Sequence, residues 1–141
     1  MRELLPLIEA DWRENGIDHD KVPLNLNIEK YLDYDTLGIL QIVTARDQEA
    51  DGALVGFVFA FVHPNIMHEG LGWAQINLYY LEKQYRGKGS GRAMVEVLLG
   101  FLVTAKVGVV EASEKIERAH GLFDRLGFKA TDRVVRKYLE D

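Results

Sequence analysis

WAQINLYYLEKQYRGKGSGRAMVEVLLGFLVTAK, residues 73–106, is the stretch that decides the fold. Apolar residues crowd positions 74–81, which predicts a strand, and they recur at 94, 97/98, 101/102 and 105, which predicts a helix. A basic glycine loop, residues 84–92, joins the two. Because the first amides of a helix lack partners and the helix dipole adds positive charge, this loop predicts an anion site, most simply for a phosphate.

The spacing of the glycines separates three interpretations of the loop. A nucleotide-hydrolase loop needs Gly, four residues, then Gly-Lys-Ser/Thr, but Gly87-Lys88 is followed by Gly89. A dinucleotide fingerprint needs a third glycine where the chain has Arg92, although Glu111 falls where an acid for the ribose is expected. The loop therefore nearly matches the dinucleotide fingerprint, and a nucleotide-binding regulatory domain stays an open alternative.

Arg86-x-x-Gly89-x-Gly91, overlapped by Gln84-x-x-Gly87-x-Gly89, fits a third pattern in full. Here the chain resembles the GCN5-related N-acetyltransferase (GNAT) superfamily, whose Gln/Arg-x-x-Gly-x-Gly/Ala loop binds the pyrophosphate of acetyl-coenzyme A. Residues 126–128, Leu-Gly-Phe, are similar to the run that closes the last helix of that family. The resemblance covers roughly residues 38–139, and the 63–68 segment is loosely similar to a linker of short phage-type members.

The resemblance implies an α/β (α+β) fold with a mixed, twisted sheet of six or seven strands flanked by about four helices. It implies an acetyl-coenzyme A-dependent N-acetyltransferase in which the amine attacks the thioester directly. The pantetheine arm would lie along Tyr80 and Leu81, and the Leu81 N–H would polarise the thioester carbonyl. The remaining expected cofactor-binding residues are Arg86, Gly87, Lys88, Gly89, Ser90, Gly91, Arg92 and Phe123.

Composition limits the alternatives. The 141 residues, 48% apolar, predict one domain, 1–141, with a core of its own. We expect a cytoplasmic protein, because no long apolar run or secretory leader is evident. A net charge of −5 argues against broad nucleic-acid binding. The sequence has no cysteine, which excludes disulfides and a cysteine acyl-enzyme.

The rest of the chain supplies further expected elements. Asp51-Gly52 marks the turn of an antiparallel hairpin, and Ser113 and Gly127 are expected to cap and to end the last helix, whose apolar stripe is Ala119, Leu122, Phe123 and Leu126. The expected helices are 2–15 and 28–35, and the expected strands are 39–46, 53–62, 107–112 (buried) and 133–139.

Acid–base groups are where the chain departs from the family. Many members have a tyrosine as the proton donor where this chain has Phe123, and an acid on the central strand where it has Asn77. His120 is the preferred general base, because an imidazole titrates near neutral pH. Glu111, Tyr80 and His68 are the other candidates.

The histidines at 63 and 68, with Glu69, admit three interpretations. They are expected to be surface side chains or part of a loop beside the cleft, rather than metal ligands, because a metal site needs three or four donors at fixed geometry. No metal is therefore expected.

The acceptor is not encoded in a recognisable motif. An amine-bearing small molecule or protein is expected. Six acids among the first twenty residues either attract a cationic amine or form a solvated helix face. A coenzyme A-binding sensor without catalysis is the alternative function. A homodimer is possible, since exposed strand edges in small sheets are often paired.

Overall fold

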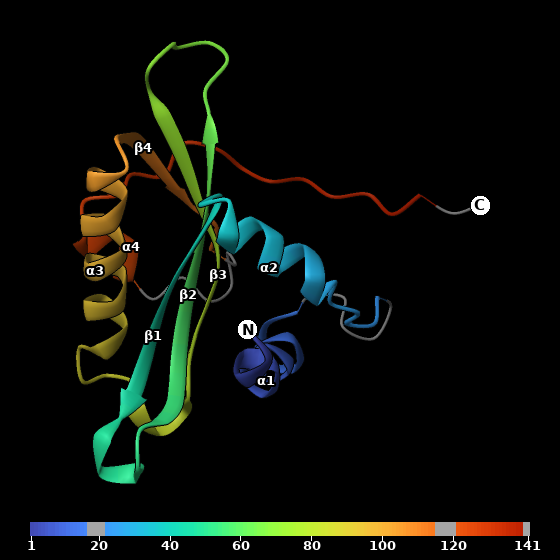
Figure 1. Ribbon diagram of the computed structural model, residues 1–141, viewed down its shortest axis with the longest axis vertical. Coiled ribbons are helices and arrows are strands. Elements are labelled where there is room, and N and C mark those ends of the chain that lie inside the picture. The colour runs from blue at the N-terminus through green and yellow to red at the C-terminus, as the bar shows by residue number, and fades with distance from the viewer. Residues whose placement is uncertain (17–21, 115–120, 140–141) are drawn as a thin grey trace.

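The computed structural model describes residues 1–16, 22–114 and 121–139. Its elements follow one another along the chain from an N-terminal helix pair to a short last helix (Figure 1). The α-helices are α1 Leu5–Asn15, α2 Ile28–Thr36, α3 Ser90–Thr104 and α4 Leu122–Arg125; the strands are β1 Leu40–Asp47, β2 Ala53–Pro64, β3 Gly72–Leu81 and β4 Val107–Ala112; and single turns of 3-10 helix are η1 Arg2–Leu4, η2 Gln48–Ala50 and η3 Lys83–Tyr85.

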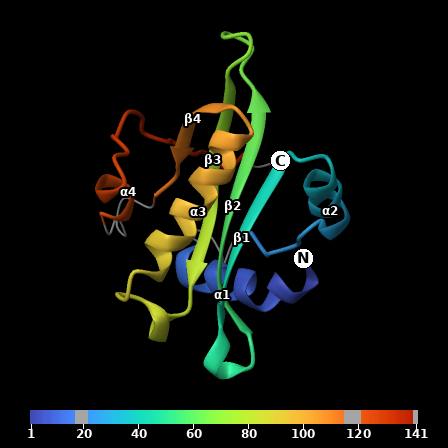
Figure 2. The same cartoon turned by 60° about the vertical axis from the view of Figure 1, so that its left-hand side comes forward.

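The sheet has four strands in the order β1-β2-β3-β4 within the described residues. β1, β2 and β3 are antiparallel neighbours, and β3 pairs with β4 in parallel. α3 is therefore the crossover helix of a β-α-β unit, and it lies along one face of the sheet (Figure 2). The mixed α+β architecture and the four helices were expected, but six or seven strands are not seen.

The predicted last strand, 133–139, is wrong. Residues 128–139 have no regular secondary structure, and they run away from the sheet in an extended course (Figure 1). Val134 and Leu139 are 78% and 88% exposed, so no neighbouring element covers their side chains. The β-branched residues that suggested a strand favour one only where a neighbouring strand gives them a half-buried surface, and this segment has no such neighbour among the described residues.

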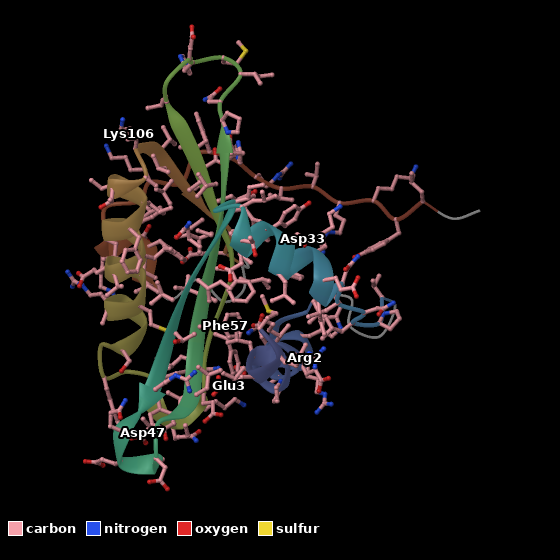
Figure 3. All side chains as sticks on the ribbon, viewed as in Figure 1. Arg2, Glu3, Asp33, Asp47, Phe57 and Lys106 are labelled. Carbon is pink, nitrogen blue, oxygen red and sulfur yellow. The ribbon has the colours of Figure 1, made fainter. Side chains whose placement is uncertain are left out.

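Two apolar clusters lie on opposite faces of the sheet (Figure 1). One lies under α3 and α4 and includes Val58, Ile76 and Phe123. The other lies under α1 and is centred on Phe57 and Phe59, with Phe57 directed from the sheet toward α1 in Figure 3. β2 is buried from 55 to 60 because it contributes to both clusters, as its continuous apolar run predicts.

α3 buries one stripe of its surface, as the apolar spacing predicted. Met94, Val95, Leu98 and Leu102 pack on the sheet, whereas Val97 and Phe101 are about half exposed. The register of the helix is thus set by the residues that reach the sheet. The first turn of α3, which begins at Ser90, overlaps the end of the glycine loop, residues 84–92.

Most other boundaries agree with the sequence, with three corrections. The first turn of the N-terminal helix is 3-10, and β4 is only half-buried because one of its edges has no partner strand among the described residues. Only α4 is described of the expected last helix. The part that should follow Ser113, residues 115–120 with Ala119, lies outside the described residues. Gly127 follows its end with a φ of 87°, which a left-handed helix cap requires.

Leu98→Ala should lower the free energy of unfolding by about 2–5 kcal/mol, because it removes a fully buried side chain from between α3 and the sheet. Val97→Ala is the matched control one residue away. Its side chain is 48% exposed, so a loss within about 0.5 kcal/mol is expected. Urea unfolding monitored by circular dichroism measures both, and equal losses would contradict the described packing of α3.

Candidate functional site

The glycine loop has the backbone geometry of an anion cradle. Gly87 and Gly89 have φ values of 77° and 87°, which side-chain-bearing residues rarely adopt, and they flank Lys88. The first helical hydrogen bond of α3 runs from the Ala93 N–H to the Gly89 carbonyl, so three earlier amides lie before that ladder begins. Such concave runs of N–H groups bind phosphates.

Open space lies in front of this loop. A Cβ atom added to Gly87, Gly89 or Gly91 would meet no heavy atom within 4 Å. The backbone is therefore approachable at all three glycines. These residues fit the pyrophosphate of a nucleotide-bearing ligand, which the amides of 87–92 would hold.

β3 and β4 separate next to the loop. Their pairing begins at Gly72 and ends at Ile76, whose carbonyl accepts a hydrogen bond from the Ser113 N–H at 2.9 Å. Asn77 is left out of the β2 register and forms a β-bulge. From there to Leu81, β3 pairs with β2 alone within the described residues.

The register shows which backbone groups face this open edge. Leu81 lies opposite Gly56, and the Glu82 N–H donates to the Val55 carbonyl at 2.9 Å. Leu81 therefore occupies a non-hydrogen-bonded position of the antiparallel ladder, and its N–H and carbonyl point away from β2. The same holds for Tyr79, two residues earlier, whereas the backbone of Tyr80 is turned toward β2.

Arg86 is exposed, but its side chain is held by other residues of the protein. Its Nε donates to the Leu81 carbonyl at 2.6 Å, and its two terminal nitrogens donate to Glu14 on α1 at 2.7 and 3.0 Å. The guanidinium also lies 5.3 Å from the centre of the Tyr80 ring. The hydrogen bond with Glu14 is the largest cause that raises the pKa of Arg86, so this side chain stays charged.

The other cations of the loop differ in their surroundings. Arg92 donates to Glu96 at 2.9 Å across one turn of α3. Tyr85, also in the loop, donates a hydrogen bond from its hydroxyl to Asp47 at 2.6 Å. This bond fixes the loop to the β1–β2 turn at the lower end of the sheet (Figure 3). It also holds the pKa of Asp47 below its ordinary value. Lys88 lies between the two positive-φ glycines, and its charge also acts on Asp47. Arg86 and Arg92 each form an ion pair with a glutamate, whereas Lys88 forms none within 4.0 Å among the described residues.

Tyr79 was not singled out from the sequence, but it lies at the open edge. Its ring meets the ring of Phe123 edge-on at a centroid distance of 5.3 Å, and Phe123 is only 3% exposed. Burial raises the pKa of Tyr79 to about 12, with smaller contributions from the charges of Glu114 and Asp11. Its hydroxyl therefore keeps its proton throughout the physiological range.

The expected acid–base residues are dispersed. His120 lies outside the described residues. Glu111 is exposed on β4 opposite Gln75, in the part where β3 and β4 are still paired. The side chain of Tyr80 is buried on the α1 side, where burial, and to a smaller extent the charge of Glu14, raises its pKa.

The histidine segment lies at the far end of β3 from the glycine loop. His63 and His68 line an open hollow beside Lys106, which Figure 3 marks near the upper turn. The paired part of β3, Gly72 to Ile76, lies between this hollow and the open edge, and the expectation that the segment borders the cleft stays a prediction. No group of three potential metal-binding side chains occurs among residues 1–16, 22–114 and 121–139.

Two of the N-terminal acids face the site rather than solvent. Asp11 is 9% exposed and accepts a hydrogen bond from Asn15 at 2.6 Å, while Glu14 binds Arg86. Asp18 and Asp20 lie outside the described residues.

In the described part of the chain, no helix has the length and apolar character needed to span a membrane.

Comparison with known proteins agrees with this geometry. The model of the acetyltransferase (GNAT) family matches residues 4–128. The chain belongs to the GNAT acetyltransferase family. This membership accounts for the glycine loop at the start of α3, and it disfavours the dinucleotide interpretation of the same loop.

Solved GNAT-like structures share the fold at low sequence identity. An acetyltransferase of Trypanosoma brucei is 19% identical with a TM-score of 0.75, over 98% of this chain and 94% of that one. A ribosomal-protein-alanine N-acetyltransferase of Brucella melitensis is 20% identical with a TM-score of 0.68, over 96% and 92%. An aminoglycoside acetyltransferase from an uncultured soil sample, in complex with sisomicin, is 16% identical with a TM-score of 0.73, over 98% and 86%. No curated protein matches the chain significantly.

Gly89→Val should weaken acetyl-coenzyme A binding at least tenfold, about 1.4 kcal/mol, because the φ of 87° is strained for valine and the loop amides would be displaced. Calorimetric titration measures the affinity, and circular dichroism confirms the fold. Gly100→Val is the matched control, since Gly100 lies on α3 outside the loop, its added Cβ meets nothing in the protein and its φ is ordinary, so wild-type affinity is expected. Wild-type affinity in a folded Gly89→Val variant would rule out the loop as the pyrophosphate site.

Proposed function

We propose that this protein is an acetyl-coenzyme A-dependent N-acetyltransferase that acts on an amine-bearing small molecule or protein. The observation that carries the proposal is that the glycine loop directly follows the open edge of β3 along the chain. The loop offers amides that have no backbone partner among the described residues, and Leu81, five residues before Arg86, turns its own N–H away from β2. One end of the site suits a pyrophosphate and the other suits a thioester carbonyl.

Acetyl-coenzyme A would supply an activated acyl group as a thioester. The amides of 87–92 and the Lys88 ammonium bind the phosphates. The Leu81 N–H donates to the carbonyl oxygen, where negative charge develops as the amine attacks. Direct attack is favoured because the chain has no cysteine to carry the acyl group. Catalysis then depends mainly on positioning.

Tyr79 is the proposed hydrogen-bond donor to the departing sulfur. Phe123 occupies the position where many family members have tyrosine, and the ring of Tyr79 packs against it. With a pKa of about 12, Tyr79 holds its proton more tightly than a thiol does. It would therefore stabilise the thiolate by hydrogen bonding without transferring its proton. The base for the amine stays a prediction, with His120 the first candidate.

A coenzyme A-binding sensor is the second candidate. It is favoured by Phe123, which is buried and cannot donate a proton, and by Asn77 in place of an acid. Thiol release from acetyl-coenzyme A in the presence of small amines, peptides and nucleosides distinguishes the two functions. An enzyme releases free thiol with at least one acceptor, whereas a sensor binds the nucleotide and releases none.

Tyr79→Phe should lower kcat about tenfold, the effect of losing one hydrogen bond of about 1.4 kcal/mol in the transition state. The KM for acetyl-coenzyme A should change little, because the phosphates bind elsewhere. Between pH 6 and 9 the ratio of mutant to wild-type rate should stay constant, since a hydroxyl with a pKa of about 12 does not titrate there. Steady-state kinetics across this pH range measures both, and an undiminished kcat in Tyr79→Phe would remove Tyr79 from the site.

A further inference from the structure

Arg86 is the residue of the glycine-loop motif whose side chain is most fully engaged by the protein. Three of its nitrogens have protein acceptors, one on the Leu81 carbonyl and two on the carboxylate of Glu14. The contact with Glu14 is bidentate, which fixes the plane of the guanidinium as well as its position. The Tyr80 ring lies against the same group. An arginine held in this way is poorly disposed to reach a pyrophosphate.

The Leu81 carbonyl is the backbone group that Arg86 holds. Both polar groups of Leu81 point away from β2, so no strand of the described sheet hydrogen-bonds them. The bond of 2.6 Å from Arg86 Nε fixes the carbonyl. The Leu81 N–H belongs to the preceding peptide group, whose Tyr80 carbonyl faces β2, so the sheet directs this N–H into the open edge. The Arg86 contact anchors the next peptide group and so limits movement of the chain directly after that N–H. That N–H is the proposed donor to the thioester oxygen.

Glu14 connects this arrangement to α1. It lies 72 residues before Arg86, and its side chain is only 20% exposed. Tyr80 is buried under α1, and the charge of the same carboxylate helps to raise its pKa, after the larger effect of burial. Glu14 thus joins α1 to the start of the glycine loop through Arg86.

We infer that Arg86 and Glu14 are positioning residues for the acyl end of the site: Glu14 fixes the Arg86 guanidinium, which in turn anchors the Leu81 carbonyl at the end of β3. This inference rests on the proposed function. Phosphate binding then falls to the backbone amides and Lys88. Arg86, although it belongs to the loop motif, contributes to the chemical step more than to nucleotide affinity.

Glu14→Gln tests this directly, because it removes the charge and one acceptor but preserves the shape of the side chain. The measurements are kcat and KM with acetyl-coenzyme A, and the Kd of 3′-phospho-ADP, the pyrophosphate-bearing half of coenzyme A. We expect kcat to fall about tenfold, because the acyl end is misplaced, while the Kd stays within twofold. Glu9→Gln is the matched control on α1, since Glu9 makes only an exposed, 4.0 Å contact with Arg13.

Arg86→Gln and the double variant complete a cycle. If Glu14 acts through Arg86, the double variant should lose no more kcat than Arg86→Gln alone. Arg86→Lys should recover part of the loss, since a lysine can donate to one of the two acceptors. Lys88→Ala provides the opposite pattern, with a weaker affinity for 3′-phospho-ADP. A tenfold loss of that affinity in Arg86→Gln would show instead that Arg86 is a phosphate ligand, and an unchanged kcat in Glu14→Gln would overturn the inference.

Amide NMR decides the inference even in the absence of turnover. In the folded Glu14→Gln variant, the Leu81 amide resonance should shift while that of Gly89 stays in place, and an unmoved Leu81 resonance would contradict the inference. If the wild-type protein binds 3′-phospho-ADP but releases no thiol with any amine, the proposed function fails and the NMR result still stands. Thermal unfolding of each variant identifies any that loses its fold, in which case Arg86→Lys gives the Leu81 comparison.

Discussion

The parallel pairing of β3 with β4 stops at Ile76, and the site depends on that limit. Up to Ile76, β3 has a partner on both edges; after the bulge at Asn77, β2 is its one partner strand among the described residues. The residues beyond the bulge keep the support of β2 while their other edge stays open. Because the chain then turns through the glycine loop into α3, the open edge and the amides at the helix start belong to one continuous segment.

Two long-range contacts place that segment. Arg86 joins the loop to α1 through Glu14, and Tyr85 joins it to the β1–β2 turn through Asp47. Both involve carboxylates far away in the sequence, and both are short. The loop is therefore fixed at its start, while the glycines that follow remain open to a ligand. This division suits a site in which the backbone binds and side chains orient.

Local patterns explain why much of this was predictable. The 3.6-residue spacing of α3, the long apolar run of β2 and the glycines at 87 and 89 each express a constraint that acts within a few residues. The contact between Arg86 and Glu14 was not predictable, since the two residues are 72 positions apart and no sequence motif contains both of them. The strand at 133–139 failed for a related reason, because strand formation depends on a neighbour that the segment's own sequence does not specify.

The amide NMR spectrum of the wild-type protein, titrated with coenzyme A, tests most directly whether the loop and the open edge of β3 form one site. The resonances of residues 87–92 and of Leu81 should shift together along a single binding isotherm. Shifts confined to residues 62–72, which line the hollow at the other end of β3, would contradict this assignment.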